Sequence, residues 1–133
     1  MLQYFTFHHI GIATRSIEKT AKYYLEAGFS MTETITDPIQ KVKITFLTKG
    51  QMPRIELLEP AMDDSPVSQI LDKSGTGPYH ICYEVDNIEE AIKDLKKKRF
   101  LPLFKPVKAV ALENRLICFL YNADVGLIEL LEK

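Results

Sequence analysis

Hydrophobic and polar positions alternate along two short stretches of the chain, FHHIGIA from Phe7 and YHICYEV from Tyr79. An alternation of period two predicts a β-strand with one buried face. After each stretch, apolar residues recur three and four positions apart, which is the spacing of one helical face. Ser16 and Asn87 stand where these helices would begin, and both residue types are favourable N-caps. The pattern therefore predicts a strand followed by a helix, twice.

Three apolar-rich stretches follow each predicted helix, so each half of the chain is predicted to be a βαβββ unit. These stretches span residues 30–35, 41–48 and 54–59 in the first half, and 101–105, 115–121 and 126–132 in the second. Each half is small and would be marginal as a separate fold, which favours one domain over residues 1–133. The predicted organisation is a first module at 6–60, a connector at 61–77 with a short helix around Pro66–Leu71, and a second module at 78–133.

The two halves also repeat each other in sequence. His9-Ile10 and His80-Ile81 open matching segments, and IELLE occurs at both Ile55–Glu59 and Ile128–Glu132, with nearly the same separation along the chain. A repeat of this kind indicates two similar structural units in tandem. Residues with the same place in the two units are expected to come together near a pseudo-twofold axis.

Histidine and glutamate occupy repeated positions inside these apolar strands. Period two places His9 and His80 on the strand face away from the helix, and Glu56 and Glu129 share a face with apolar neighbours. A buried carboxylate needs a cation, a hydrogen-bond partner or a raised pKa. One divalent cation bound by all four side chains would meet that need, and Zn, Ni, Co, Mn and Fe all suit such ligands. A solvent-facing glutamate and a structural histidine would give the same pattern, so both interpretations stay open here.

The composition favours no macromolecular partner. The chain is 46% hydrophobic and 26% charged with a net charge of −1, which is typical of a soluble globular protein. No apolar run approaches the roughly 20 residues of a membrane-spanning helix, and the first residues do not form a signal peptide. We therefore predict a cytoplasmic protein that binds neither nucleic acid nor membrane. Cys82 and Cys118 lie in apolar strands, where reduced and buried thiols are expected.

Several longer stretches resemble the vicinal-oxygen-chelate superfamily, which includes glyoxalases, methylmalonyl-CoA epimerases, extradiol dioxygenases and bleomycin-resistance proteins. The resemblance covers nearly the whole chain and is nearest to methylmalonyl-CoA epimerase-like proteins. It implies an α+β fold in which two tandem βαβββ modules form a glyoxalase-like curved mixed sheet with a central metal cleft. The stretches that carry it are HHIGIATRSIEKTAKYY, VKITFLTKG followed by IELLEPAMDDSPVSQIL, YHICYEVDNIEEAIKDL and GLIELLE.

The same resemblance assigns roles to individual residues. Matched position by position, it implies that one divalent metal ion is bound by His9, Glu56, His80 and Glu129. Glu129 and Glu56 are also the implied catalytic bases. Epimerases often carry glutamine where this chain has Glu56, so the ligand set is glyoxalase-like on an epimerase-like background. In place of the Gly-rich segment with a basic residue that epimerases carry before the seventh strand, the chain has VALENR, which leaves Arg115 to contact a substrate anion.

The implied activity is that of an isomerase or lyase that removes a proton next to a carbonyl group, with the metal holding the resulting enediolate. The substrate would be a thioester or a hemithioacetal, as for methylmalonyl-CoA epimerase or lactoylglutathione lyase. The alternative is a binding protein of the bleomycin-resistance type that sequesters a small molecule without chemistry. An iron-dependent dioxygenase uses two histidines and one glutamate, so Glu56 counts against that activity. The resemblance also implies a homodimer.

Overall fold

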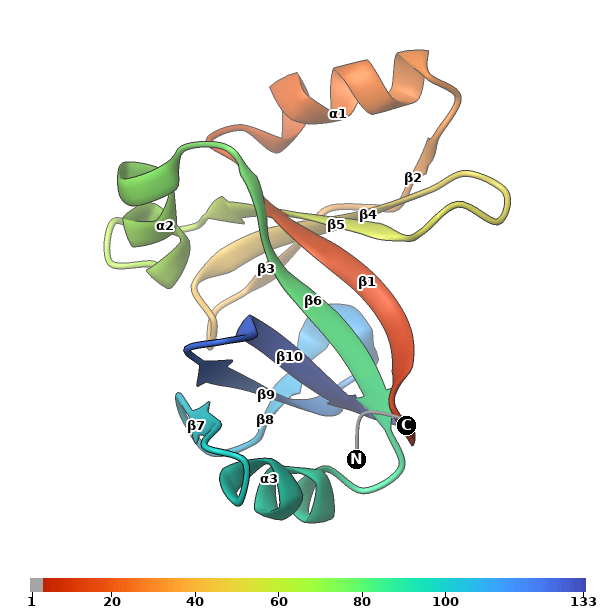
Figure 1. Ribbon diagram of the computed structural model, residues 1–133. Coiled ribbons are helices and arrows are strands. Elements are labelled where there is room, and N and C mark those ends of the chain that lie inside the picture. Colours follow the sequence, from red (N-terminus) through yellow and green to blue (C-terminus); the bar gives the residue numbers. More distant parts are fainter. Residues whose placement is uncertain (1–3) are drawn as a thin grey trace. The chain divides into compact units, whose positions relative to one another are not determined.

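The computed structural model describes residues 4–133, which form two compact units. One unit comprises His9–Tyr79, and the other comprises His80–Lys133 together with the N-terminal residues as far as His8. Each unit combines helices with a mixed β-sheet (Figure 1).

The first unit has the predicted βαβββ order followed by the connector helix. Its sheet has the strand order β2-β4-β5-β1, and β3 also pairs with β4. The pair β1 and β5 is parallel, and the pairs made by β4 are antiparallel. Its elements are β1 (Thr6–Ala13), whose first residues belong to the other unit, α1 (Ile17–Glu26), β2 (Ser30–Met31), β3 (Ile35–Asp37), β4 (Val42–Thr48), β5 (Ile55–Pro60) and α2 (Pro66–Ser74).

The second unit repeats this plan. Its strand order is β6-β10-β9-β7, β8 also pairs with β9, and only the pair β6 and β10 is parallel. The two βαβββ modules predicted from the sequence are thereby confirmed. The elements are β6 (Gly77–Val85), which starts in the first unit, α3 (Ile88–Lys96), β7 (Leu101–Pro102), β8 (Val107–Ala109), a 3₁₀ turn (Val110–Leu112), β9 (Arg115–Asn122) and β10 (Gly126–Glu132).

The strand predicted at 30–35 is two short strands, β2 and β3. Between them, the Thr32 hydroxyl accepts a hydrogen bond from the Phe46 backbone N–H at 2.9 Å, in the place of a backbone carbonyl. The strand predicted at 101–105 ends at Pro102 as β7, and β8 at Val107–Ala109 is a further short strand that was not predicted. There Pro102 and Pro106 lack the N–H group that a continuous ladder requires.

Each helix packs on one face of its own sheet. In the first unit, Ile12 of β1 packs with Ile17 and Ala21 of α1, and Ile10 lies beside them. In the second, Val85 of β6 belongs to the core of α3. The faces predicted for the two opening strands are therefore confirmed, and the histidines occupy the opposite faces.

The starts of α1 and α3 are capped in the same manner. Ser16 and Asn87 are the N-caps, as predicted, and each side chain accepts a hydrogen bond from the backbone N–H three residues further on. A carboxylate adds to each cap. Glu59 accepts from the first N–H of α1 at 2.8 Å, and Glu132 accepts from the first N–H of α3 at 2.9 Å. The last glutamate of each IELLE segment thus joins the end of a strand to the start of a helix.

The ends of α1 and α3 also correspond. Gly28 follows α1 with a φ of 95°, and Arg99 follows α3 with a φ of 67°. In both cases the following residue donates its N–H to the carbonyl five positions earlier. Phe29 donates to Tyr24 at 3.0 Å, and Phe100 donates to Leu95 at 3.1 Å. Gly28 closes the first helix as predicted, and Arg99 adopts the left-handed conformation that suits glycine.

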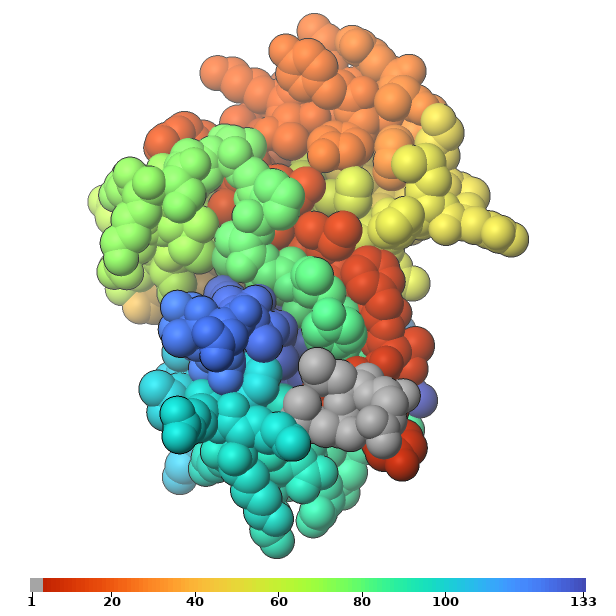
Figure 2. Space-filling view, viewed as in Figure 1, coloured from red at the N-terminus to blue at the C-terminus, as the bar shows by residue number. Residues whose placement is uncertain are grey.

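The remaining elements agree with the sequence analysis. The connector helix α2 is longer than the predicted 66–71, and Ser65 caps its start. Cys82 and Cys118 are buried and not joined to each other. Among the helices of residues 4–133, none is long and apolar enough to cross a membrane. The outer face of α1, orange in Figure 2, is open to solvent, with Tyr23 74% exposed.

Candidate functional site

His9 and Glu56 form a buried pair in the first unit. β1 and β5 are parallel neighbours, and Gly11 lies in register with Glu56. Since residues two apart share a strand face, His9 is the diagonal neighbour of Glu56 on that face. The His9 Nε2 atom lies 3.1 Å from Glu56 Oε1, and both side chains are almost fully buried.

His80 and Glu129 form the equivalent pair in the second unit. β6 and β10 are parallel, and Cys82 lies in register with Glu129, as Gly11 does with Glu56. The His80 Nε2 atom lies 3.2 Å from Glu129 Oε1, again with both side chains buried. The strand pairing of each module therefore places one imidazole against one carboxylate.

The donor atoms of these pairs fit a divalent metal ion. Two imidazoles and two carboxylates, all buried, are a set consistent with a metal site. Burying a carboxylate in an apolar strand costs free energy unless a hydrogen bond or a cation compensates it. In each pair the imidazole nitrogen lies within hydrogen-bond distance of the carboxylate, and a bound cation would satisfy both groups.

A phenylalanine accompanies each pair. Phe46 of β4 lies in register with Glu56, and Phe119 of β9 lies in register with Glu129. The ring centres of His9 and Phe46 are 5.5 Å apart at 72°, and those of His80 and Phe119 are 5.0 Å apart at 86°. Sequence analysis assigned these phenylalanines no role. The signal was present, because their separation along the chain equals that of the two IELLE segments.

Arg115, the predicted contact for a substrate anion, belongs to an ion pair at the start of β9. Its Nη2 atom donates to Glu84 at 2.5 Å, and its Nε donates to the backbone carbonyl of Glu132 at 2.8 Å. The hydrogen bond from Arg115 lowers the pKa of Glu84, and the charge of His8 lowers it further. About a quarter of each side chain is exposed. A substrate contact by Arg115 stays a prediction.

The Cys118 thiol is unsuited to nucleophilic chemistry. Burial raises its pKa to about 11, and the nearby Glu89 carboxylate contributes to the increase. The sulfur donates to the carbonyl of Phe104 at 3.2 Å. A thiol with such a pKa stays protonated at neutral pH, so this cysteine acts as a core residue.

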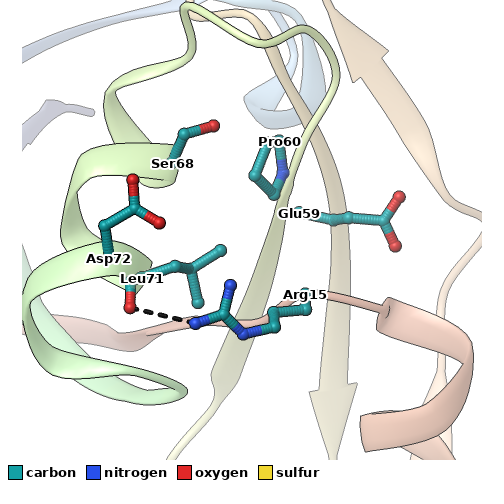
Figure 3. A pocket seen from close by; sticks show the side chains of 6 residues that line it. All are labelled: Arg15, Glu59, Pro60, Ser68, Leu71 and Asp72. Atoms are coloured by element: carbon teal, nitrogen blue, oxygen red, sulfur yellow. Dashed lines mark hydrogen bonds between the residues drawn. The ribbon is translucent and has the colours of Figure 1, made fainter.

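A surface hollow of about 300 Å³ lies between α2 and the ends of β1 and β5 (Figure 3). Arg15 reaches across it and donates to the Leu71 carbonyl at 3.2 Å. Glu59 turns away from α2, in keeping with its hydrogen bond to α1. Neither predicted metal ligand of this unit lines the hollow, which is bordered by Arg15, Glu59, Pro60, Ser68, Leu71 and Asp72.

Comparison with known proteins gives consistent matches. Residues 8–119 match the family described as the glyoxalase/bleomycin resistance protein/dioxygenase superfamily. The mitochondrial methylmalonyl-CoA epimerase of Homo sapiens is 37% identical over 127 residues, which are 92% of this chain and 71% of the human protein. A Streptomyces coelicolor methylmalonyl-CoA epimerase variant, solved in complex with 2-nitronate-propionyl-CoA, has a TM-score of 0.83 and 26% identity over 96% of each chain. A hypothetical protein from Bacillus halodurans C-125 has a TM-score of 0.86 and 33% identity, over 97% of this chain and 94% of that protein.

Proposed function

The chain belongs to the glyoxalase/bleomycin resistance/dioxygenase superfamily as a methylmalonyl-CoA epimerase-like enzyme, and on this premise we propose that it transfers a proton at the carbon next to the carbonyl of an acyl-CoA thioester. The observation that carries the proposal is the buried histidine and glutamate pair that occurs once in each module. Such pairs combine metal ligands with groups that can accept a proton.

In this proposal one divalent metal ion, Zn, Ni, Co, Mn or Fe, is bound by His9, Glu56, His80 and Glu129. When bound, a divalent cation polarises a substrate carbonyl and stabilises negative charge that develops on its oxygen. The four side chains are buried, which keeps bulk water from competing with the substrate for them.

The two carboxylates take the acid and base roles. Glu129 accepts the proton from the substrate carbon, and Glu56 is the matching group of the other module. Return of the proton to the opposite face of the same carbon inverts its configuration, which is an epimerase reaction. Return to the neighbouring carbon gives the isomerisation catalysed by a lactoylglutathione lyase.

Methylmalonyl-CoA is the preferred candidate substrate. The human relative is a methylmalonyl-CoA epimerase, and the Streptomyces coelicolor relative binds 2-nitronate-propionyl-CoA. One observation favours a second candidate, the hemithioacetal of methylglyoxal and glutathione. Glu56 provides a second carboxylate where epimerases often carry glutamine. Two histidines and two glutamates are the ligand set that resembles that of glyoxalases.

Proton exchange tests the proposal directly. The metal-loaded protein is incubated in D₂O with methylmalonyl-CoA or with the hemithioacetal, and NMR follows deuterium at the carbon next to the carbonyl. We expect deuterium in methylmalonyl-CoA with wild-type protein, and none with Glu129→Gln or with His80→Ala. Elemental analysis of each preparation reports whether the metal is present.

The other outcomes point to different functions. Turnover of the hemithioacetal alone would establish the lyase. A protein that neither contains metal nor binds it when it is added back, and that exchanges neither substrate, would be the sequestering type. The cytoplasmic location and the homodimer belong to the proposal as well, and the relatives include both mitochondrial and bacterial epimerases.

A further inference from the structure

Each buried histidine makes a T-shaped ring contact with a phenylalanine, and the two phenylalanines occupy equivalent positions in the two modules. The ring planes cross at 72° for His9 and Phe46, and at 86° for His80 and Phe119. A histidine side chain has two soft torsions, and the second sets the plane in which Nε2 points. A ring packed at a steep angle against the imidazole blocks rotation about that second torsion.

We propose that Phe46 and Phe119 are positioning residues that hold the imidazoles of His9 and His80 with Nε2 directed at the carboxylate of the same pair. This inference rests on the proposed function, because the benefit of a fixed imidazole is a preorganised metal ligand. Each phenylalanine lies directly across the sheet from the glutamate of its pair, so imidazole, carboxylate and ring are placed by three adjacent strands.

The two modules also contain a second repeated pair of phenylalanines that lacks this arrangement. Phe29 and Phe100 have the same separation along the chain as His9 and His80, and they pack in the helix-side cores, Phe29 with α1 and Phe100 with α3. They are therefore matched controls, because their removal disturbs packing in the same unit without touching a ring contact to His9 or His80.

The two positioning residues are not held equally firmly. Phe119 is buried, and its ring centre also lies 6.0 Å from that of Phe104. Phe46 is only partly buried. We therefore expect the loss of Phe119 to affect metal binding more than the loss of Phe46.

The experiment compares four leucine variants, Phe46→Leu, Phe119→Leu, Phe29→Leu and Phe100→Leu, with Phe46→Tyr as the variant that keeps the ring. Each protein is titrated with Co²⁺, which reports both affinity and, through its visible absorption, ligand geometry. Thermal unfolding of the metal-free proteins measures packing separately. We expect Phe46→Leu to bind Co²⁺ about tenfold more weakly and Phe119→Leu more weakly still, each with a changed spectrum, since residues that orient metal ligands have effects of about 10- to 100-fold.

The control variants should unfold at lower temperature yet bind Co²⁺ with wild-type affinity and spectrum, and Phe46→Tyr should also match the wild type. Wild-type affinity and spectrum in both Phe46→Leu and Phe119→Leu would overturn the inference. The inference would also be overturned if Phe29→Leu and Phe100→Leu lost affinity for Co²⁺ in proportion to their loss of thermal stability. Absence of Co²⁺ binding in the wild-type protein is a different result, because it overturns the proposed function itself.

Discussion

At the scale of single residues, the two glutamates of each IELLE segment have different surroundings because they lie three positions apart on a strand. Period two places such residues on opposite faces. Glu129 therefore meets His80, whereas Glu132 meets the start of α3. The repeated segment thus places a site residue and a helix cap on one short strand.

This difference gives a matched pair of variants. Glu129→Gln should lower kcat about 10²- to 10⁴-fold, the usual contribution of a general acid or base. Glu132→Gln should keep its activity and lose about 1 kcal/mol of stability, since it weakens the charge at a helix N-terminus. Steady-state kinetics with metal content measured on the same samples, together with urea unfolding, checks both. Equal loss of activity in the two variants would contradict the assignment of Glu129 as the base.

The Glu84 and Arg115 pair predicts a pH dependence. Because the pKa of Glu84 is lowered in the folded protein from its ordinary value of 4.5, the ion pair stabilises the protein above that value, and this stability is lost as the pH falls through the lowered pKa. Glu84→Gln should cost about 0.5–1 kcal/mol at pH 7 for a partly exposed pair. The difference from wild type should shrink below pH 4.5 in urea unfolding.

Alternation and the repeat drew attention to the four histidine and glutamate residues, but only the family resemblance gave them the role of metal ligands, which stays a prediction. Alternation and the repeat could not reveal that Arg115 pairs with Glu84, which is 31 residues away in sequence. Pairing across strands depends on register, and no local pattern in β6 or β9 specifies it. The contacts of Phe46 and Phe119 with the histidines were not predicted, although the two phenylalanines occupy equivalent positions in the repeat. An apolar residue in an apolar strand is expected to be a core residue and gives no sign of a chemical role.

At the scale of helices and strands, the caps were predictable because they depend on residue type at one position. The divided edge strands were not. The gap between β2 and β3 arises from one threonine hydroxyl that accepts the N–H of Phe46, and a threonine is otherwise favourable in a strand. Between β7 and β8 the prolines were visible in the sequence, but the apolar residues around them gave the stronger pattern.

The helix ends give a prediction at this scale. Arg99 has a φ of 67° at the place where α1 is followed by Gly28. A side chain in the left-handed region costs about 1 kcal/mol relative to glycine, so Arg99→Gly should stabilise the protein by about that amount. Gly28→Ala should do the opposite, because its φ of 95° is a backbone conformation that alanine rarely adopts. Urea unfolding of both variants measures the two effects, and a destabilised Arg99→Gly would show that the arginine side chain contributes more than its backbone costs.

At the scale of the whole molecule, the duplicated module explains why the site residues come in pairs. Each module can build its own histidine and glutamate pair from local strand pairing alone. The proposal that one ion binds both pairs requires more, because residues of both modules must then bind the same ion. The predicted homodimer is separate from it, and size-exclusion chromatography with light scattering will test it, with a monomer as the contrary result.

Metal removal distinguishes one shared ion from two independent ions. A ligand that binds only the folded state at about 100 times its Kd adds about 2.7 kcal/mol to the free energy of unfolding, so EDTA should lower the unfolding midpoint and added metal should restore it. If both pairs bind one ion, His9→Ala and His80→Ala should each abolish the whole increment. If each pair binds its own ion, each variant should keep about half of the stabilisation that the metal gives to the wild type. Glu132→Gln is the control, since Glu132 lies on the strand face opposite to Glu129 and caps α3, and it should keep the full response to metal.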